Sequence, residues 1–254
     1  MNENRKEKSE NRKALPKFAL TMAGSLLVGG LIGFVTGFSR AFGLDTAAFA
    51  QWLDKAVCAA TPWGIPVTSV LTLGGCFLLY RSAVKKFAAW DGGDEDETSE
   101  SIDILLSWVL LLSAVQLLID LFFMAAVGTY YLEGGALPIV GMFILSCGCV
   151  ILAQQKAVDL TRRMNPEKRG SVYDTKFQKT WYDSMDESER QQTGQACYRA
   201  YMVASRFCLA LWLALVILST VFKMSILPVF ILLLVWGVMQ VTYTLECIRL
   251  SKKQ

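Results

Sequence analysis

The stretch that decides the fold is residues 104–127, ILLSWVLLLSAVQLLIDLFFMAAV, in which Asp120 is the one charged side chain. A helix needs about 20 apolar residues to cross the roughly 30 Å hydrocarbon layer of a bilayer. The stretch has that length, and the charged residues of the chain cluster between it and similar stretches that carry almost no charge. Residues 104–127 are therefore predicted to span a membrane.

Working outward from this stretch, five more segments meet or approach the same length. Of the 254 residues, 54% are hydrophobic and 19% are charged, so six spans leave little of the chain for a soluble core. The fold predicted is an all-α polytopic membrane helix bundle with six transmembrane helices. These helices are residues 18–38, 63–80, 104–127, 137–153, 207–222 and 226–245.

The basic residues predict how the bundle is oriented. Lys and Arg concentrate in the loops on the cytoplasmic side of polytopic membrane proteins. With both termini in the cytoplasm, only Arg40, Lys55 and Lys223 of the 25 basic residues fall on the outer side. A different number of spans would spoil this partition. We therefore expect a multi-pass plasma membrane protein with its N- and C-termini inside.

The spans pair into three hairpins that two longer cytoplasmic segments connect. Asp45 is placed to cap a helix over residues 45–58, and this helix is expected to lie on the outer membrane surface. The chain divides into a basic tail (1–17), a first hairpin (18–80), an acidic loop (81–101), a second hairpin (102–155), a cytoplasmic helical segment (156–206), a third hairpin (207–248) and a second basic tail (249–254).

The cytoplasmic segment 156–206 contains two signals for the start of a helix. Ser171 with Asp174, and Ser184 with Glu187, have the spacing of a capping box. The first pair predicts a short helix. The second pair predicts a helix that continues into the fifth span.

Three aromatic residues of the same segment recur every four positions: Tyr173, Phe177 and Trp181. On a helix this spacing gathers side chains on one face. The apolar stripe is a candidate surface for a protein partner, although it would also fit against the membrane surface or against the protein's own bundle.

Residues 165–174 (NPEKRGSVYD), 176–181 (KFQKTW) and 185–189 (MDESE) resemble a membrane-protein family of Gram-positive bacteria, catalogued as domain of unknown function 3169. The similarity extends over nearly the whole chain, including the basic tail that leads into a Gly-rich first span. It implies a bacterial integral membrane protein. It implies no activity, cofactor or catalytic residue.

Several classes of enzyme are excluded by residue types that the chain lacks. It has no histidine, which removes Ser-His catalysis and HExxH zinc sites. An intramembrane aspartyl protease would need two carboxylates deep in the bilayer, and only Asp120 qualifies. The seven cysteines lack the spacing of a disulfide framework or a metal site. We expect no enzyme, with no catalytic residue, cofactor or metal.

Asp120 is instead a candidate intramembrane polar site. A charged residue at bilayer depth costs about 2.5–3.5 kcal/mol on insertion scales, so a buried partner, water or protonation must offset that cost. Ser113 and Gln116 precede Asp120 on the same helix face, and Gln240 and Thr244 in the sixth span are candidate partners. Two interpretations stay open: a hydrogen bond that locks helices together, and a site on a path for a substrate, ion or proton.

The first span carries small residues every four positions. Small side chains let the backbones of two helices approach closely. The strip predicts close packing within the bundle, or alternatively the seam of a homo-oligomer. It consists of Ser25, Gly29, Gly33, Gly37 and Ala41.

These features favour a non-enzymatic accessory or regulatory membrane component that acts through its cytoplasmic segment. The alternative is a small transporter or channel with a polar site around Asp120. The expected partners are a protein at the cytoplasmic segment and the anionic head groups of the bilayer. The latter are expected to contact the basic tails, which lie beside the membrane, and nucleic acid is not an expected partner.

Overall fold

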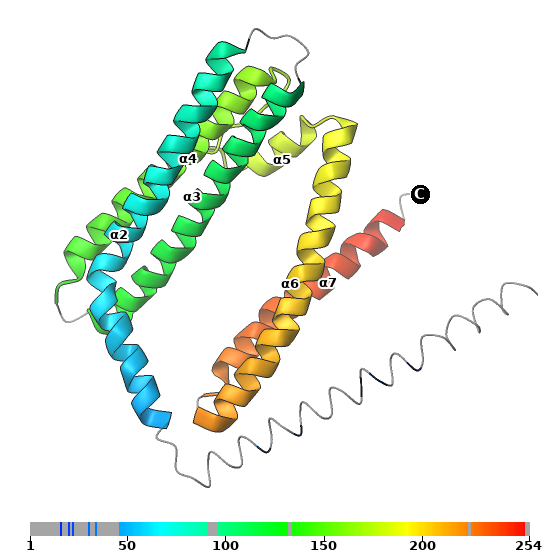
Figure 1. The fold of residues 1–254 in the computed structure, drawn as a ribbon. Coiled ribbons are helices and arrows are strands. Elements are labelled where there is room, and N and C mark those ends of the chain that lie inside the picture. Colours follow the sequence, from blue (N-terminus) through cyan, green and yellow to red (C-terminus); the bar gives the residue numbers. More distant parts are fainter. Residues whose placement is uncertain are drawn as a thin grey trace, which may run out of the picture. The chain divides into compact units, whose positions relative to one another are not determined.

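The computed structural model describes residues 46–90, 96–131, 134–222 and 225–251, together with isolated positions of the first predicted span. Every regular element in these ranges is an α-helix, which confirms the all-helical prediction (Figure 1). The helices are α2 (Thr46–Ala89), α3 (Asp96–Tyr130), α4 (Ala136–Met164), α5 (Phe177–Asp183), α6 (Glu187–Phe222) and α7 (Leu227–Ser251). The small-residue strip Ser25, Gly29, Gly33, Gly37 and Ala41 lies outside the described residues.

Five of the described helices are long and apolar enough to cross a membrane, as expected for an integral membrane protein. They contain the second to fifth predicted spans, and the sixth except for its first residue, since α7 begins at Leu227. Each helix is longer than the span predicted within it, because the chain stays helical where its charged residues begin. For example, α4 continues to Met164, beyond the predicted end of the fourth span at residue 153.

The helix predicted over residues 45–58 is continuous with the second span, because both belong to α2. Pro62 and Pro66 lie inside this helix. A proline in a helix interior removes a backbone hydrogen bond and bends the helix. Figure 1 shows the blue N-terminal part of α2 at an angle to the rest of the helix. The structure therefore has one bent helix where two separate helices were predicted.

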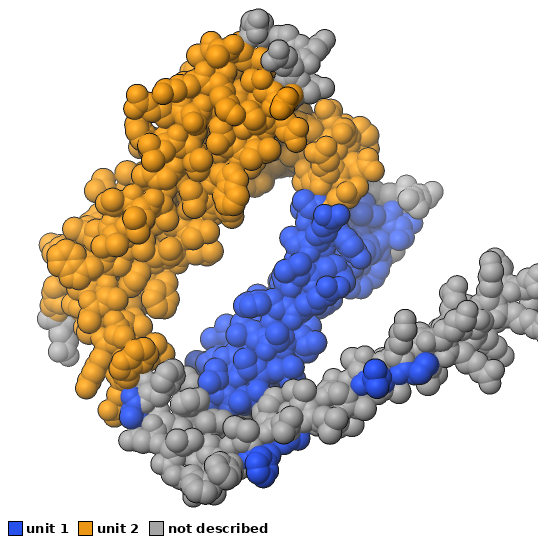
Figure 2. Space-filling model, viewed as in Figure 1, with its two compact units in different colours: residues 1–50, 196–254 blue, residues 51–195 orange. Residues whose placement is uncertain are grey.

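The chain divides into two compact units (Figure 2). Unit 2 comprises residues 51–195, which include most of α2, all of α3, α4 and α5, and the first turns of α6. Unit 1 comprises residues 1–50 and 196–254; of the described helices, it contains residues 46–50 of α2, the remainder of α6, and all of α7. Each unit has its own set of contacts.

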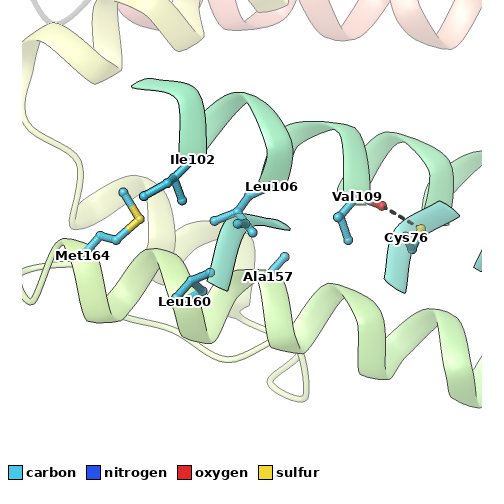
Figure 3. Close-up of a cluster of buried hydrophobic side chains, with 8 residues drawn as sticks. Cys76, Ile102, Leu106, Val109, Ala157, Leu160 and Met164 are labelled. Carbon is cyan, nitrogen blue, oxygen red and sulfur yellow. Dashed lines mark hydrogen bonds between the residues drawn. The ribbon is translucent and has the colours of Figure 1, made fainter. Parts of the chain in front are cut away.

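In unit 2, α2, α3 and α4 pack together around two groups of buried apolar side chains. The first, here the Cys76 layer, consists of Cys76, Ala83, Ile102, Leu106, Val109, Ala157, Leu160 and Met164 (Figure 3). The second, here the Ile65 layer, consists of Ile65, Val127 and Ile139. From the Ile65 layer to the Cys76 layer, residue numbers rise along α2 and α4 but fall along α3. Helix α3 therefore runs antiparallel to its two neighbours.

In unit 1, α6 and α7 are joined by polar and aromatic contacts. The rings of Tyr201 and Tyr243 stack with their centroids 4.5 Å apart. The Tyr201 hydroxyl donates to Gln240 Oε1 at 2.6 Å, and Gln240 Nε2 donates to Ser205 Oγ at 2.9 Å. The Trp236 indole N–H donates to the same serine oxygen at 3.0 Å.

The first of the two predicted capping boxes is wrong. Helix α5 begins at Phe177, and no side chain caps it. The Ser171 hydroxyl accepts a bond from the Tyr173 N–H, and the Asp174 carboxylate accepts one from the Lys176 N–H. In both, the side chain of one residue accepts a bond from the N–H two residues later. Serine and aspartate form such turns as an alternative to the backbone hydrogen bonds of a helix.

The second predicted capping box is displaced by two residues. Asp186 Oδ1 accepts from the Glu189 N–H at 2.7 Å, and Glu189 Oε2 accepts from the Asp186 N–H at 3.1 Å. This reciprocal pair caps α6, which then continues as one helix to Phe222, as predicted for the fifth span. Ser184 is engaged elsewhere: its hydroxyl accepts a bond from the Arg169 N–H at 3.1 Å.

Candidate functional site

A layer of polar side chains lies in unit 2 between the Cys76 layer and the Ile65 layer. On α3, Ser113, Gln116 and Asp120 are all 0% exposed. Gln116 and Asp120 are four residues apart, a spacing that places two side chains one above the other on a helix. We call this the polar layer; it also contains Thr68, Ser69 and Thr72 of α2, and Ser146 of α4.

Both oxygens of the Asp120 carboxylate receive a hydrogen bond. Gln116 Nε2 donates to Oδ1 at 2.8 Å, and the Ser146 hydroxyl donates to Oδ2 at 2.6 Å. A buried acceptor that lost its donor would keep the full cost of leaving water. The two donors therefore explain how α3 holds an acidic side chain among apolar neighbours.

The remaining bonds close a circuit around the carboxylate. The Ser69 and Ser146 hydroxyl oxygens lie 2.9 Å apart, and since the proton of Ser146 points at Asp120, Ser69 is the donor of this pair. Ser69 in turn accepts from Gln116 Nε2 at 2.9 Å. Each hydroxyl thus donates once, and Ser146 accepts a second, longer bond from Gln116 Nε2 at 3.5 Å. The circuit joins α2, α3 and α4.

The amide oxygen of Gln116 has its own donor. The Thr72 hydroxyl lies 2.6 Å from Gln116 Oε1, so the amide is used on both sides. Among the described residues, Asp120 has no bond to a lysine or arginine, and no cluster of three His, Cys, Asp or Glu residues is suited to hold a metal. Chemically, the arrangement is a set of matched donors and acceptors that fastens three helices together.

The sequence placed Ser113, Gln116 and Asp120 on one face of α3, and the structure has them there. Gln240 and Thr244 belong to unit 1, where Gln240 bonds to Ser205 and Tyr201, and the Thr244 hydroxyl donates to the backbone of Gln240. Their pairing with Asp120 stays a prediction. Within unit 2, the partner of Asp120 on another helix is Ser146.

Four contributors were missed by the sequence analysis: Thr68, Ser69, Thr72 and Ser146. A signal for the first three exists, because they place three hydroxyl groups within about one turn of the helix predicted for an apolar span. Ser146 has no comparable signal. A single serine is common in membrane helices and usually bonds its own backbone.

The three aromatic residues predicted to form a stripe do not share one helix. Tyr173 precedes α5 and is 64% exposed. Phe177 and Trp181 lie on α5, half-buried, with ring centroids 5.5 Å apart. The Phe177 ring lies against Gly170, whose φ of +126° is a conformation that favours glycine. The stripe is thus divided into a packed pair and one exposed tyrosine.

The segment around these aromatics, residues 165–190, is here called the cap. Its Lys168 side chain is only 4% exposed and forms an ion pair with Glu189 at the start of α6. Gln155 of α4 accepts two bonds from the cap, from the Ser171 hydroxyl at 3.1 Å and the Val172 N–H at 2.8 Å. The cap is therefore a folded part of unit 2, tied to the end of α4.

The family model described as "Protein of unknown function (DUF3169)" matches residues 12–246. The chain belongs to this family. The resemblance to this family is confirmed, and residues 165–189, which carried it, lie in the cap of this DUF3169 protein. No curated protein and no solved structure matches the chain.

Proposed function

We propose that this DUF3169 protein is a non-enzymatic accessory or regulatory component of the plasma membrane, which contacts a protein partner through its cap. The supporting observation is that the cap is ordered: Lys168, only 4% exposed, forms an ion pair with Glu189 within the cap, and Gln155 of α4 accepts two hydrogen bonds from it. A surface that is already ordered loses less conformational entropy when a partner binds.

The exposed aromatics of the cap suit such a contact. Tyr173 is 64% exposed and Tyr182 is 48% exposed. Tyrosine is enriched in protein–protein interfaces because it combines a large apolar ring with a hydroxyl. The saturated polar layer supports the same proposal, since a carboxylate with a donor on each oxygen serves to fasten helices.

The orientation belongs to this proposal as well. With six spans and both termini inside, the cap lies in the cytoplasm, where a soluble partner reaches it. The distribution of Lys and Arg supports this orientation, because only Arg40, Lys55 and Lys223 of the 25 basic residues then fall outside.

The test is photo-crosslinking in cells that express the full chain with p-benzoylphenylalanine at position 173. We expect one reproducible protein adduct. Lys168→Gln, which removes the ion pair that orders the cap, should reduce the yield of this adduct, whereas Lys85→Gln removes the same charge outside the cap and should leave the yield unchanged. A set of lipid adducts alone, or equal yields from the two variants, would contradict the proposal.

A small transporter or channel is the second candidate, and the observation that favours it is the buried Asp120. Among the described residues this carboxylate has two hydrogen-bond donors and no basic partner. A transported cation would supply the positive charge that balances it. Flux of monovalent cations into proteoliposomes that Asp120→Asn abolishes would establish this function in place of the first. Equal flux in wild type, Asp120→Asn and empty liposomes would remove it.

A further inference from the structure

A groove on unit 2 lies between α2 and α4, with α3 as its floor. Its volume is about 240 Å³. The floor is Val109 of α3, which is almost fully buried, whereas Phe77 and Leu152 on the two walls are exposed. The groove therefore opens sideways, away from the packed core of the three helices.

The two walls have the same construction. Leu73, Cys76, Phe77 and Tyr80 line the groove from α2, and Cys149, Leu152, Ala153 and Lys156 line it from α4. Both sets have the spacing i, i+3, i+4 and i+7, which keeps four side chains on one helix face over two turns. Because α2 and α4 run in the same direction, the two stripes lie side by side along the groove.

The groove is apolar along its length and polar at one end. Tyr80 and Lys156 are the last members of their stripes, so the hydroxyl and the ammonium group lie at the same end. Lys156 is exposed and forms no salt bridge with the described residues. This is also the end at which the predicted spans 63–80 and 137–153 stop, where tyrosine and lysine typically meet the lipid head groups.

The size and polarity of the groove indicate what kind of molecule it binds. Pockets for drug-sized molecules have volumes of about 300–1,000 Å³, so this groove is better matched to part of a flexible chain. Apolar walls at bilayer depth fit hydrocarbon. An unpaired ammonium group at the interface fits a negatively charged phosphate, and basic pockets between transmembrane helices are known to bind anionic head groups.

We propose that this groove binds one acyl chain of an anionic phospholipid, whose phosphate contacts the Lys156 ammonium group. The site is separate from the polar layer and from the cap, and it does not depend on the function proposed above. It assigns a specific lipid contact to helix α4, in addition to the general attraction between basic tails and head groups.

The experiment is native mass spectrometry of the purified full chain after lipid is removed and added back in detergent. The two lipids are phosphatidylglycerol and phosphatidylcholine with identical acyl chains. We expect wild type to retain one phosphatidylglycerol at collision energies that strip phosphatidylcholine. Lys156→Gln should weaken phosphatidylglycerol binding about fivefold, which is the effect expected for one basic residue near a membrane surface.

Lys85→Gln is the matched control for charge. Lys85 is exposed at the same end of α2 but does not line the groove, so this variant should retain the wild-type preference. Ala153→Phe should fill the groove and reduce the binding of both lipids, whereas Ile151→Phe places the same ring outside it. Equal retention of the two lipids by wild type, or equal losses in Lys156→Gln and Lys85→Gln, would overturn the proposal.

A second measurement covers the case in which Ala153→Phe does not fold. Cys149 lines the groove and is exposed, so a bound acyl chain should slow its reaction with a maleimide. Cys197, which is also exposed, gives the reference rate by peptide mass spectrometry. Phosphatidylglycerol should protect Cys149 in wild type and fail to protect it in Lys156→Gln. Protection of Cys149 in lipid-free detergent would mean that protein covers the groove, which would also overturn the proposal.

Discussion

Ser146 shows that one hydroxyl group can link three helices of an apolar bundle by hydrogen bonds. It donates to Asp120 and accepts from Ser69, so a single oxygen atom of α4 is hydrogen-bonded to both α3 and α2. Hydrogen bonds between membrane helices average only about 0.6 kcal/mol, but a bond to a carboxylate lies above that average. Ser146 matters for stability because its loss would leave one oxygen of the buried Asp120 carboxylate without a hydrogen-bond donor.

Ser146→Ala should therefore destabilise the protein by about 1–3 kcal/mol, the cost of leaving a buried acceptor without its donor. The measurement is the denaturation midpoint in detergent micelles. Ser107→Ala is the control, because Ser107 is an exposed serine of α3. If the two variants unfold at the same midpoint, the circuit around Asp120 contributes nothing to stability.

Gly64 and Gly74 on α2 should respond to alanine with opposite signs. Replacing glycine by alanine in a helix normally stabilises by about 0.8–1.0 kcal/mol. A Cβ at Gly74 meets nothing within 4 Å, so Gly74→Ala should raise the midpoint. A Cβ at Gly64 would overlap the ring of Phe123, which packs against the Ile65 layer, so Gly64→Ala should lower it. A gain in both variants would show that this ring moves aside freely.

The helices themselves show which sequence signals are reliable. Long apolar stretches located all five described membrane-length helices, since their length alone distinguishes them from loops. Ser184 with Glu187 and Asp186 with Glu189 both have capping-box spacing, and only tertiary structure selects between them. Ser184 is already bonded to Arg169 across the cap, and Asp186 is left to cap α6.

Asp186→Ala tests this assignment at the level of one helix. Loss of an N-cap side chain costs about 0.5–2 kcal/mol, and the first turn of α6 should fray. Hydrogen exchange of the amides from 186 to 190 should become faster, because the Glu189 N–H loses its acceptor. Ser188→Ala, an exposed change in the same turn, should leave the exchange unchanged. Equal exchange in both variants would contradict the cap.

For the whole molecule, the sequence predicted an all-helical membrane protein and three residues of the polar layer, Ser113, Gln116 and Asp120. Gln116 and Asp120 could be found because their spacing is local to α3. Ser146 could not be found, because it meets Asp120 only where α4 packs against α3, 26 positions further along the chain. The same reason applies to Lys168, whose burial depends on Glu189, 21 positions along the chain. Pairs of residues that are far apart in the chain produce no regular spacing that a sequence pattern could reveal.

Reporter fusions test the predicted topology of the complete chain. Alkaline phosphatase is active only outside the cytoplasm. We expect fusions near Glu133 and Met224 to be active and a fusion after Arg169 to be inactive, because the positive-inside distribution puts the cap in the cytoplasm. A fluorescent protein fused after Arg169 should give the complementary signal. An active phosphatase at Arg169 would reverse the orientation of every described helix.

The circuit around Asp120 also determines how far α4 is shifted along α3. Leucine, valine and isoleucine pack acceptably at several offsets, so an apolar bundle alone leaves the axial alignment weakly specified. Sliding α4 by one turn, about 5.4 Å, would bring Met142 or Val150 opposite the carboxylate. Neither side chain is a hydrogen-bond donor. As a single buried asparagine does in a coiled coil, Ser146 and Asp120 select one alignment by making its neighbours costly.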